Sequence, residues 1–290
     1  MSMIHDLVAA VYKDGYRIEL EFDDGLGLKE MREYRTHIWN EAITYLEQRI
    51  DGSLLREYMS PSEGRNPRTI TQAYRSLVDS IQNRQGMPNS IGSLDRLSGV
   101  LCAFDPKAVL ASYPDGWSDL FAAIEHDVRP ASRMDKENNH NFWVIFCKAC
   151  LSAAKYLTRF ETLADFLRYV QDFDTNPNTR PALPLLIGHE VFGVKFALAC
   201  DFLKEIGFSN YSKPDTHLTD IFTGLGLCEG APLDVFRAVT EMSVDVRETP
   251  YAVDKVFWLI GSGNLYRHGR TFHTDKQEYV RIALSKWQEK

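Results

Sequence analysis

A lysine and an aspartate 20 positions apart, Lys195 and Asp215, are the residues of this sequence whose types best suit chemistry. Periodicity predicts that Lys195 lies near the start of an almost wholly apolar helix, 190–206. Its neighbours at helical spacing are Val191, Phe192, Leu198 and Ala199. Burial among such side chains lowers the pKa of a lysine and leaves a nucleophilic amine. The alternative is a lysine whose stem packs on the core while its charge reaches water.

Asp215 stands just before a second predicted helix, 216–225. Pro214 favours an extended approach, so the aspartate takes the N-cap position, where a carboxylate accepts hydrogen bonds from backbone amides. A capping role alone accounts for an aspartate at this place. Taken alone, Asp215 is therefore interpreted as a capping residue.

Helical periodicity dominates the rest of the chain, and the sequence therefore predicts an all-α fold. The other predicted helices are 28–49, 68–84, 91–103, 106–113, 117–126, 138–158, 161–172, 232–243, 250–260 and 275–288. Thr249 and Pro250 are typical of a helix start, and Gly261 is typical of a helix end. Strict alternation over 16–22 predicts one strand, paired in a small hairpin near the N-terminus.

Composition and charge limit the classes of protein that fit. With 290 residues, 44% hydrophobic and 25% charged, the chain is globular. No stretch approaches the roughly 18 consecutive apolar residues of a membrane span, and no signal peptide is recognisable, so we expect a cytoplasmic monomer without membrane contact. The net charge of -7 disfavours a nucleic-acid partner. However, residues 1–60 hold 12 acids and 7 bases, which leaves 28 acids and 26 bases for the rest, so a local basic face remains possible.

The cysteines predict neither a disulfide framework nor a metal site. Their number is odd, five, and they are scattered along the chain. Cys147 and Cys150 have the spacing of a redox or zinc pair, but they lie inside a predicted helix without a second pair, which favours packing. We therefore expect no metal and no cofactor.

Two motifs together resemble a known superfamily, the helix-hairpin-helix DNA glycosylases, which include endonuclease III and the oxoguanine glycosylases. Gly193-Val-Lys-Phe-Ala197 resembles the lysine that opens a buried helix, and Pro214-Asp-Thr-His-Leu218 resembles the triplet that carries the catalytic aspartate. Weaker similarity covers 73–82, 104–113 and 251–261, so the resemblance spans about residues 68–265. The chain departs from the family at its hairpin, where Leu183-Pro184 is not followed by the usual glycines and a longer turn is expected.

The resemblance implies a two-lobed core, 68–270, with a cleft between the lobes, an N-terminal extension, 1–67, and a C-terminal helix, 271–290. It implies that Asp215 stabilises a cationic sugar, while Lys195 either attacks that sugar and forms a Schiff base or binds phosphate. Other residues are implied to contact DNA: Gln82, which replaces an extruded base, Gly193, Lys213 and His217. The family's iron–sulfur loop is absent, because no cysteine follows Cys228.

The function implied is excision of a modified base from double-stranded DNA, with possible Schiff-base lyase activity. The base itself is open: an oxidised purine, an alkylated base and a hypermodified base of foreign, phage DNA all fit, so repair and antiphage defence are both compatible. The rival from another class is a non-enzymatic helical module that binds DNA or protein and has kept the fold without the chemistry. The acidic charge and the altered hairpin favour that rival. The presence of both Lys195 and Asp215 favours the enzyme.

Overall fold

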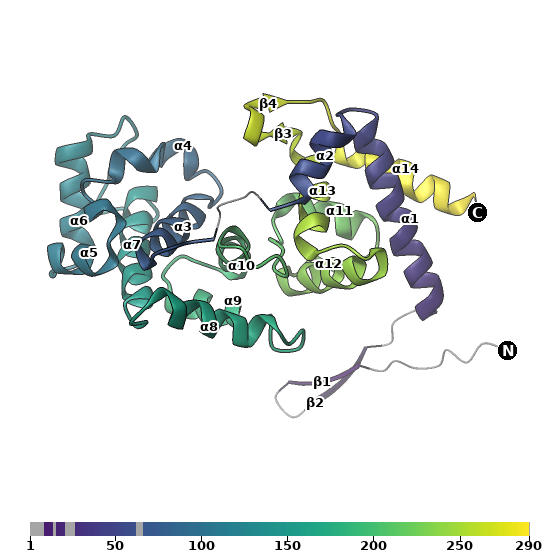
Figure 1. Ribbon diagram of the computed structural model, residues 1–290, viewed down its shortest axis with the longest axis horizontal. Helices are drawn as coiled ribbons and strands as arrows, with labels where there is room; N and C mark the ends of the chain where they lie inside the picture. The colour runs from purple at the N-terminus through teal and green to yellow at the C-terminus, as the bar shows by residue number, and fades with distance from the viewer. Residues whose placement is uncertain (1–8, 14–15, 21–26, 62–65, 290) are drawn as a thin grey trace.

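The computed structural model describes residues 9–13, 16–20, 27–61 and 66–289, and the fold is all-α, as the periodicity predicts. Across these ranges the helices form two lobes, each built around an apolar core of its own (Figure 1). No helix in the described part of the chain has both the length and the apolar character needed to cross a membrane.

The first lobe contains the consecutive helices α3 to α10. Their bounds are α3 (Ile70–Gln82), α4 (Pro88–Ile91), α5 (Pro106–Ser112), α6 (Trp117–Ala123), α7 (Phe142–Leu157), α8 (Leu163–Asp174), α9 (Ala182–Glu190) and α10 (Phe196–Glu205). Helix α7 is central and packs on α3, α4, α5 and α6. It is buried on most of its surface, and Cys147 and Cys150 lie in its core, where burial raises the pKa of both thiols. The packing role predicted for these two cysteines is therefore confirmed.

The second lobe combines both ends of the chain. Its helices are α1 (Leu28–Glu47), α2 (Gly52–Met59), α11 (Thr216–Gly224), α12 (Pro232–Val246), α13 (Pro250–Ser262) and α14 (Lys276–Gln288). Helix α13 is the central one, with α1, α2, α11, α12 and α14 packed around it. Two buried tyrosines form hydrogen bonds between the outer helices. The hydroxyl of Tyr34 donates to the carbonyl oxygen of Leu225 at 2.6 Å, and the hydroxyl of Tyr279 donates to the carbonyl oxygen of Ile38 at 2.8 Å.

This arrangement corrects the predicted domain boundaries. The described part of the segment 1–67 includes α1 and α2, which belong to the second core and are not an extension. The C-terminal segment 271–290 likewise contributes α14, whose Tyr279 and Ala283 are fully buried in the same core. The physical reason is that α13 is apolar nearly all round and needs helices from both ends of the chain to cover it.

Several predicted elements are confirmed and others are not. The N-terminal hairpin exists: β1 (Ala9–Lys13) pairs antiparallel with β2 (Tyr16–Leu20), while residues 21 and 22 of the predicted strand lie outside the described residues. Helix α2, helix α9 and the short pair β3 (Asn264–Leu265) with β4 (Arg270–Thr271) are not predicted. The predicted helix 91–103 consists of short turns, because Gly92, with a φ of +73°, ends α4 and Cys102 and Ala103 at the other end also have positive φ.

We expect Tyr279→Ala to lower the free energy of unfolding by about 3–5 kcal/mol, the usual cost of deleting a buried aromatic ring. The ring is fully buried, packs against Tyr45 and Phe257, and its hydroxyl bonds to α1. Urea denaturation measures the change. The matched control, Gln277→Ala on the exposed face of α14, should change stability by less than about 0.5 kcal/mol. Equal stability of the two variants would show that α14 is an appendage.

Candidate active site between the lobes

A cleft of about 650 Å³, here called the interlobe cleft, lies where the two lobes meet. It is lined by the residues after α3, the turn before α10, the loop into α11, and α13. Five of the six predicted site residues line it: Gly193, Lys195, Lys213, Asp215 and His217. Arg84, Gln85, Phe142 and Trp258 are further lining residues. The cleft thus combines one carboxylate with three permanent cations and two aromatic faces.

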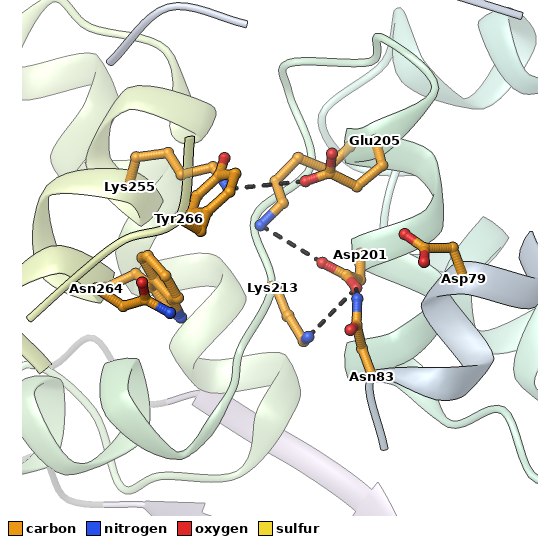
Figure 2. A pocket seen from close by; sticks show the side chains of 10 residues that line it. Asp79, Asn83, Asp201, Glu205, Lys213, Lys255, Asn264 and Tyr266 are labelled. Atoms are coloured by element: carbon orange, nitrogen blue, oxygen red, sulfur yellow. Dashed lines mark hydrogen bonds and ion pairs between the residues drawn. The ribbon is translucent and has the colours of Figure 1, made fainter. Parts of the chain in front are cut away.

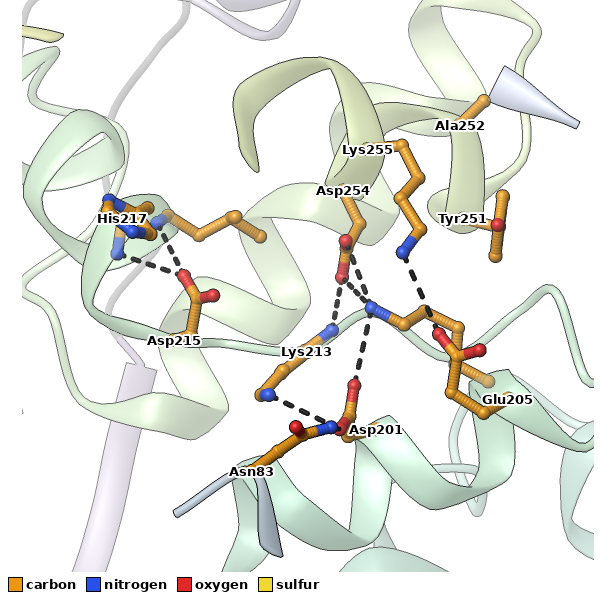
Figure 3. A network of polar contacts seen from close by, with 12 residues as sticks. Asn83, Asp201, Glu205, Lys213, Asp215, His217, Tyr251, Ala252, Asp254 and Lys255 are labelled. Carbon is orange, nitrogen blue, oxygen red and sulfur yellow. Dashed lines mark hydrogen bonds and ion pairs between the residues drawn. The ribbon is translucent and has the colours of Figure 1, made fainter. Parts of the chain in front are cut away.

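Asp215 is the N-cap of α11, as predicted. Its Oδ1 accepts hydrogen bonds from the backbone N–H groups of His217 and Leu218 at 2.9 and 3.1 Å (Figure 3). Its Oδ2 has no hydrogen-bond partner among the described residues. Burial, and then repulsion from Asp254, raise the pKa of Asp215 above its ordinary value, against the backbone bond from Leu218 and the charge of Lys213. The carboxyl group is therefore fixed through one oxygen and free to act through the other.

The expected burial of Lys195 is wrong. The apolar segment is not one helix: α9 ends at Glu190, a turn of five residues follows, and Lys195 is the N-cap of α10. Its side chain is exposed and makes no hydrogen bond or ion pair with any described residue. The periodic argument fails because Gly193, with a φ of +72°, turns the chain and removes Lys195 from the helical face that the spacing implied. The apolar surroundings that would make it a free amine are missing.

The turn between α9 and α10 is compact, which corrects the longer hairpin that the sequence suggested. The two helices pack on one another and are joined by residues 191–195. A Cβ at Gly193 would lie 3.4 Å from Ile145 and 3.8 Å from Nη1 of Arg84, so the turn lies directly beside the end of α3. The N-terminus of α10 has no side-chain cap, and Ala197 and Leu198 of its first turn line the cleft. Uncapped amides at a helix N-terminus favour anions.

Gln82 is not brought to the cleft. Its side chain is buried, and its amide donates to the carbonyl of Gly92 within the first lobe. The residues that follow it line the cleft instead, namely Asn83, Arg84 and Gln85. The sequence signal for them is the polar run directly after a predicted helix.

The imidazole of His217 packs against α13 at Gly261. A Cβ on this glycine would lie 2.5 Å from the Cβ of His217, so only glycine permits the contact. The sequence predicts that Gly261 ends the helix, and this is wrong. Helix α13 continues to Ser262, and Gly263, with a φ of +62°, is its C-cap. Thr249 and Pro250 start the helix as predicted. Nδ1 of His217 is buried without a hydrogen-bond partner among the described residues.

A buried network of charges holds the loop that leads to Asp215 (Figure 3). Asp254 of α13 accepts two hydrogen bonds from Nζ of Lys204, both at 3.1 Å, and one from the backbone N–H of Lys213. Asp201 of α10 accepts from Nζ of Lys213 at 3.2 Å and from the amide of Asn83 at 3.0 Å. The network therefore joins α3, α10, α13 and the loop, so it connects both lobes at the base of the cleft.

Asp201 has a pKa of about 2, below its ordinary value of 3.8. Burial alone would raise the pKa, but Lys213 and Lys204 outweigh it. Lys204 is buried too, and Asp254 and Asp201 more than offset that burial and raise its pKa. These groups are thus charged at neutral pH. Their sequence signal is the presence of charged residues within otherwise apolar helices.

A second cavity of about 510 Å³ adjoins the cleft and shares Asn83, Lys213 and Trp258 with it. Lys255, Asn264 and Tyr266 from the second lobe face Asp79 and Glu205 from the first (Figure 2). We call this space the Lys255 cavity. The carboxylate of Asp79 has no hydrogen-bond or ion-pair partner among the described residues, and burial, together with Asp201 and Glu205, raises its pKa.

Among the described residues, no group of three or more histidine, cysteine, aspartate or glutamate side chains is arranged to hold a metal ion. Comparisons with known proteins yield no relative: no family model, no curated protein and no solved structure matches the chain.

Lowering the pH should destabilise the protein between about pH 4 and pH 2 through Asp201. A carboxyl group with a depressed folded-state pKa stabilises the fold fully above its unfolded pKa and loses this contribution as the pH falls through the folded pKa. With pKa values of 3.8 and about 2, the contribution is about 2 kcal/mol. We expect Asp201→Asn to be less stable at pH 7 and to show a shallower decline in urea unfolding from pH 4 to pH 2.

The control for this experiment is Asp172→Asn, at an exposed position of α8. It should follow the wild-type decline. If Asp201→Asn also follows the wild-type decline, then Asp201 is not the carboxyl group whose protonation weakens the fold.

Proposed function

We propose that the protein is a DNA N-glycosylase, which rotates a modified nucleotide out of a duplex and cleaves its glycosidic bond. The observation that carries the proposal is the placement of Asp215. Its half-buried carboxylate is fixed by two backbone amides through one oxygen, and the other oxygen is free in the interlobe cleft. The resemblance of the segments around Lys195 and Asp215 to the helix-hairpin-helix glycosylases supports the same reaction.

Asp215 would act on the sugar as the base departs. The breaking bond leaves positive charge on the sugar ring, and a preorganised carboxylate in a partly water-excluded site stabilises such a charge strongly. Its free oxygen can also orient or deprotonate an attacking water. The product is then a free base and an abasic site in an intact strand.

The cations around the cleft account for DNA binding despite the net charge of -7. Lys195 is exposed, Arg84 lies beside the turn at Gly193, and the first amides of α10 are uncapped. These groups fit a phosphate on either side of the extruded nucleotide. We therefore assign Lys195 to phosphate binding, and Gly193 allows the backbone of the turn to approach.

The Lys255 cavity adjoins the cleft that Asp215 lines, and we assign the extruded base to this cavity. Tyr266 is 39% exposed and its ring centroid lies 5.6 Å from that of Trp258, so two aromatic side chains line the space in which we propose that the base stacks. Asp79 offers an acceptor for N–H groups of a base. The volumes of the two adjoining spaces suit a damaged base and also a hypermodified base of phage DNA with a polar substituent, so both repair and defence remain proposals.

Asp215→Asn should reduce single-turnover base release by about a hundredfold or more, because asparagine keeps the cap but lacks the charge that faces the developing cation. The assay is a panel of duplexes that each carry one modified base, including phage DNA with modified cytosines. The control, Asp220→Asn on the exposed side of the same helix, should retain wild-type rates. Release that is equally fast in Asp215→Asn would exclude the aspartate from catalysis.

Lys195→Gln should weaken binding to all duplex sequences alike and reduce the slope of log affinity against log salt by about one, as expected for the loss of one phosphate contact. Fluorescence anisotropy across a salt series measures the slope. Lys155→Gln, an exposed lysine of α7 that lines neither space, is the matched control. An affinity independent of salt in the wild type would favour the rival, a helical module that binds protein.

A further inference from the structure

A buried lysine with the surroundings expected of a reactive amine is present in the structure, at Lys255 of α13. Only 6% of this residue is exposed. Its Nζ lies 5.2 to 5.7 Å from the centroids of three aromatic rings, those of Tyr251, Trp258 and Tyr266. It nevertheless lines a cavity that adjoins the interlobe cleft and shares the lining residues Lys213 and Trp258 with it. The amine is therefore removed from bulk water but accessible from the cavity.

The charges around Lys255 oppose one another. Glu205 lies 3.7 Å from Nζ, which favours the ammonium form but exceeds hydrogen-bond distance. Burial, followed by repulsion from Lys204, outweighs this attraction and lowers the pKa of Lys255. Because Asp254 and Asp201 keep Lys204 charged, Lys255 is the member of this lysine pair whose pKa is lowered. A desolvated lysine beside another cation is a recognised way to produce an amine nucleophile.

The other lysines that line the two spaces do not meet these conditions. Lys195 is exposed. Lys213 donates its ammonium protons to Asp201, and Lys204 donates to both oxygens of Asp254. Lys255 is thus the lysine, among those lining the cleft and the cavity, that combines burial, an accessible amine and no hydrogen bond to a carboxylate.

We propose that Lys255 is an amine nucleophile for an aldehyde, specifically for C1′ of the ring-opened sugar at an abasic site in DNA. The proposal rests on the proposed function in one respect, since base release would supply this sugar and vacate the cavity. The neutral amine adds to C1′ and its proton passes to the carbonyl oxygen. The hydroxyl group of this carbinolamine then takes up one proton from solvent and leaves as water, which gives a protonated imine.

The imine then leads to strand cleavage without any further reactant except water. A carboxylate removes a proton from C2′, and the electron pair of that C–H bond expels the 3′ phosphate. Glu205 and Asp79 lie on the cavity wall, and its raised pKa makes Asp79 a stronger base than an ordinary aspartate. Hydrolysis of the resulting imine consumes the water released earlier and restores the amine of Lys255.

The test uses the full-length protein and a duplex in which the abasic site is prepared beforehand. Sodium borohydride added during incubation reduces an imine to a stable protein–DNA adduct. We expect wild type and the control Lys155→Gln, at an exposed lysine that lines neither space, to form the adduct and Lys255→Gln to lose it. Mass spectrometry of the wild-type adduct should locate the reduced sugar on Lys255. This mapping decides the matter even if Lys255→Gln fails to fold.

Three results would overturn the proposal: no adduct in the wild type, an adduct mapped to Lys195, or an undiminished adduct in folded Lys255→Gln. Because the abasic site is made in advance, none of these results depends on base release. Conversely, failure of the protein to release any base, with a normal adduct at Lys255, would refute the glycosylase proposal and leave the amine assignment intact. The two failures are therefore distinguishable.

Discussion

The arrangement of the site depends on the bonds that the buried carboxylate of Asp254 forms with Lys204 and with the backbone of Lys213. Asp254 is 1% exposed and bonds with both oxygens to Lys204 of the opposite lobe, while one oxygen also accepts the backbone N–H of Lys213. A buried carboxylate left without such partners would be strongly unfavourable, so both lobes and the loop must remain in register. Asp215 follows Lys213 by two residues, and its position is therefore set from α13 rather than from α11 alone.

The same network gives similar side chains different chemical properties. Asp201 has lysine and amide partners and a depressed pKa, whereas Asp215 has backbone partners, a nearby anion in Asp254 and a raised pKa. The two lysines differ in the same manner: Asp254 and Asp201 raise the pKa of Lys204 against its burial, whereas burial and repulsion from Lys204 lower the pKa of Lys255. Burial is common to all four groups. Opposite charges outweigh it at Asp201 and Lys204, whereas burial together with a like charge moves the pKa of Asp215 and of Lys255 toward the neutral form.

Local sequence signals predict the all-α fold and the position of Asp215, because a proline followed by a capping aspartate acts over a few residues. The same kind of reasoning misplaces Lys195, since hydrophobic periodicity continues across the turn at Gly193 and hides the break between α9 and α10. It also misses Lys255, whose neighbours Glu205 and Tyr266 come from distant segments. The available signal is subtler: Asp254 and Lys255 are the charged residues of an otherwise apolar helix, α13.

The properties of Lys255 depend on both lobes at once. The rings around its amine belong to the second lobe, whereas Lys204 and Glu205 belong to α10 of the first. Separation of α10 from α13 would admit water to the amine and move Lys204 away, and both changes favour the ammonium form. It would also release the backbone of Lys213 from Asp254 and so free the loop that carries Asp215. Contact between the lobes therefore controls the carboxylate and the amine together, although the two groups lie in different spaces.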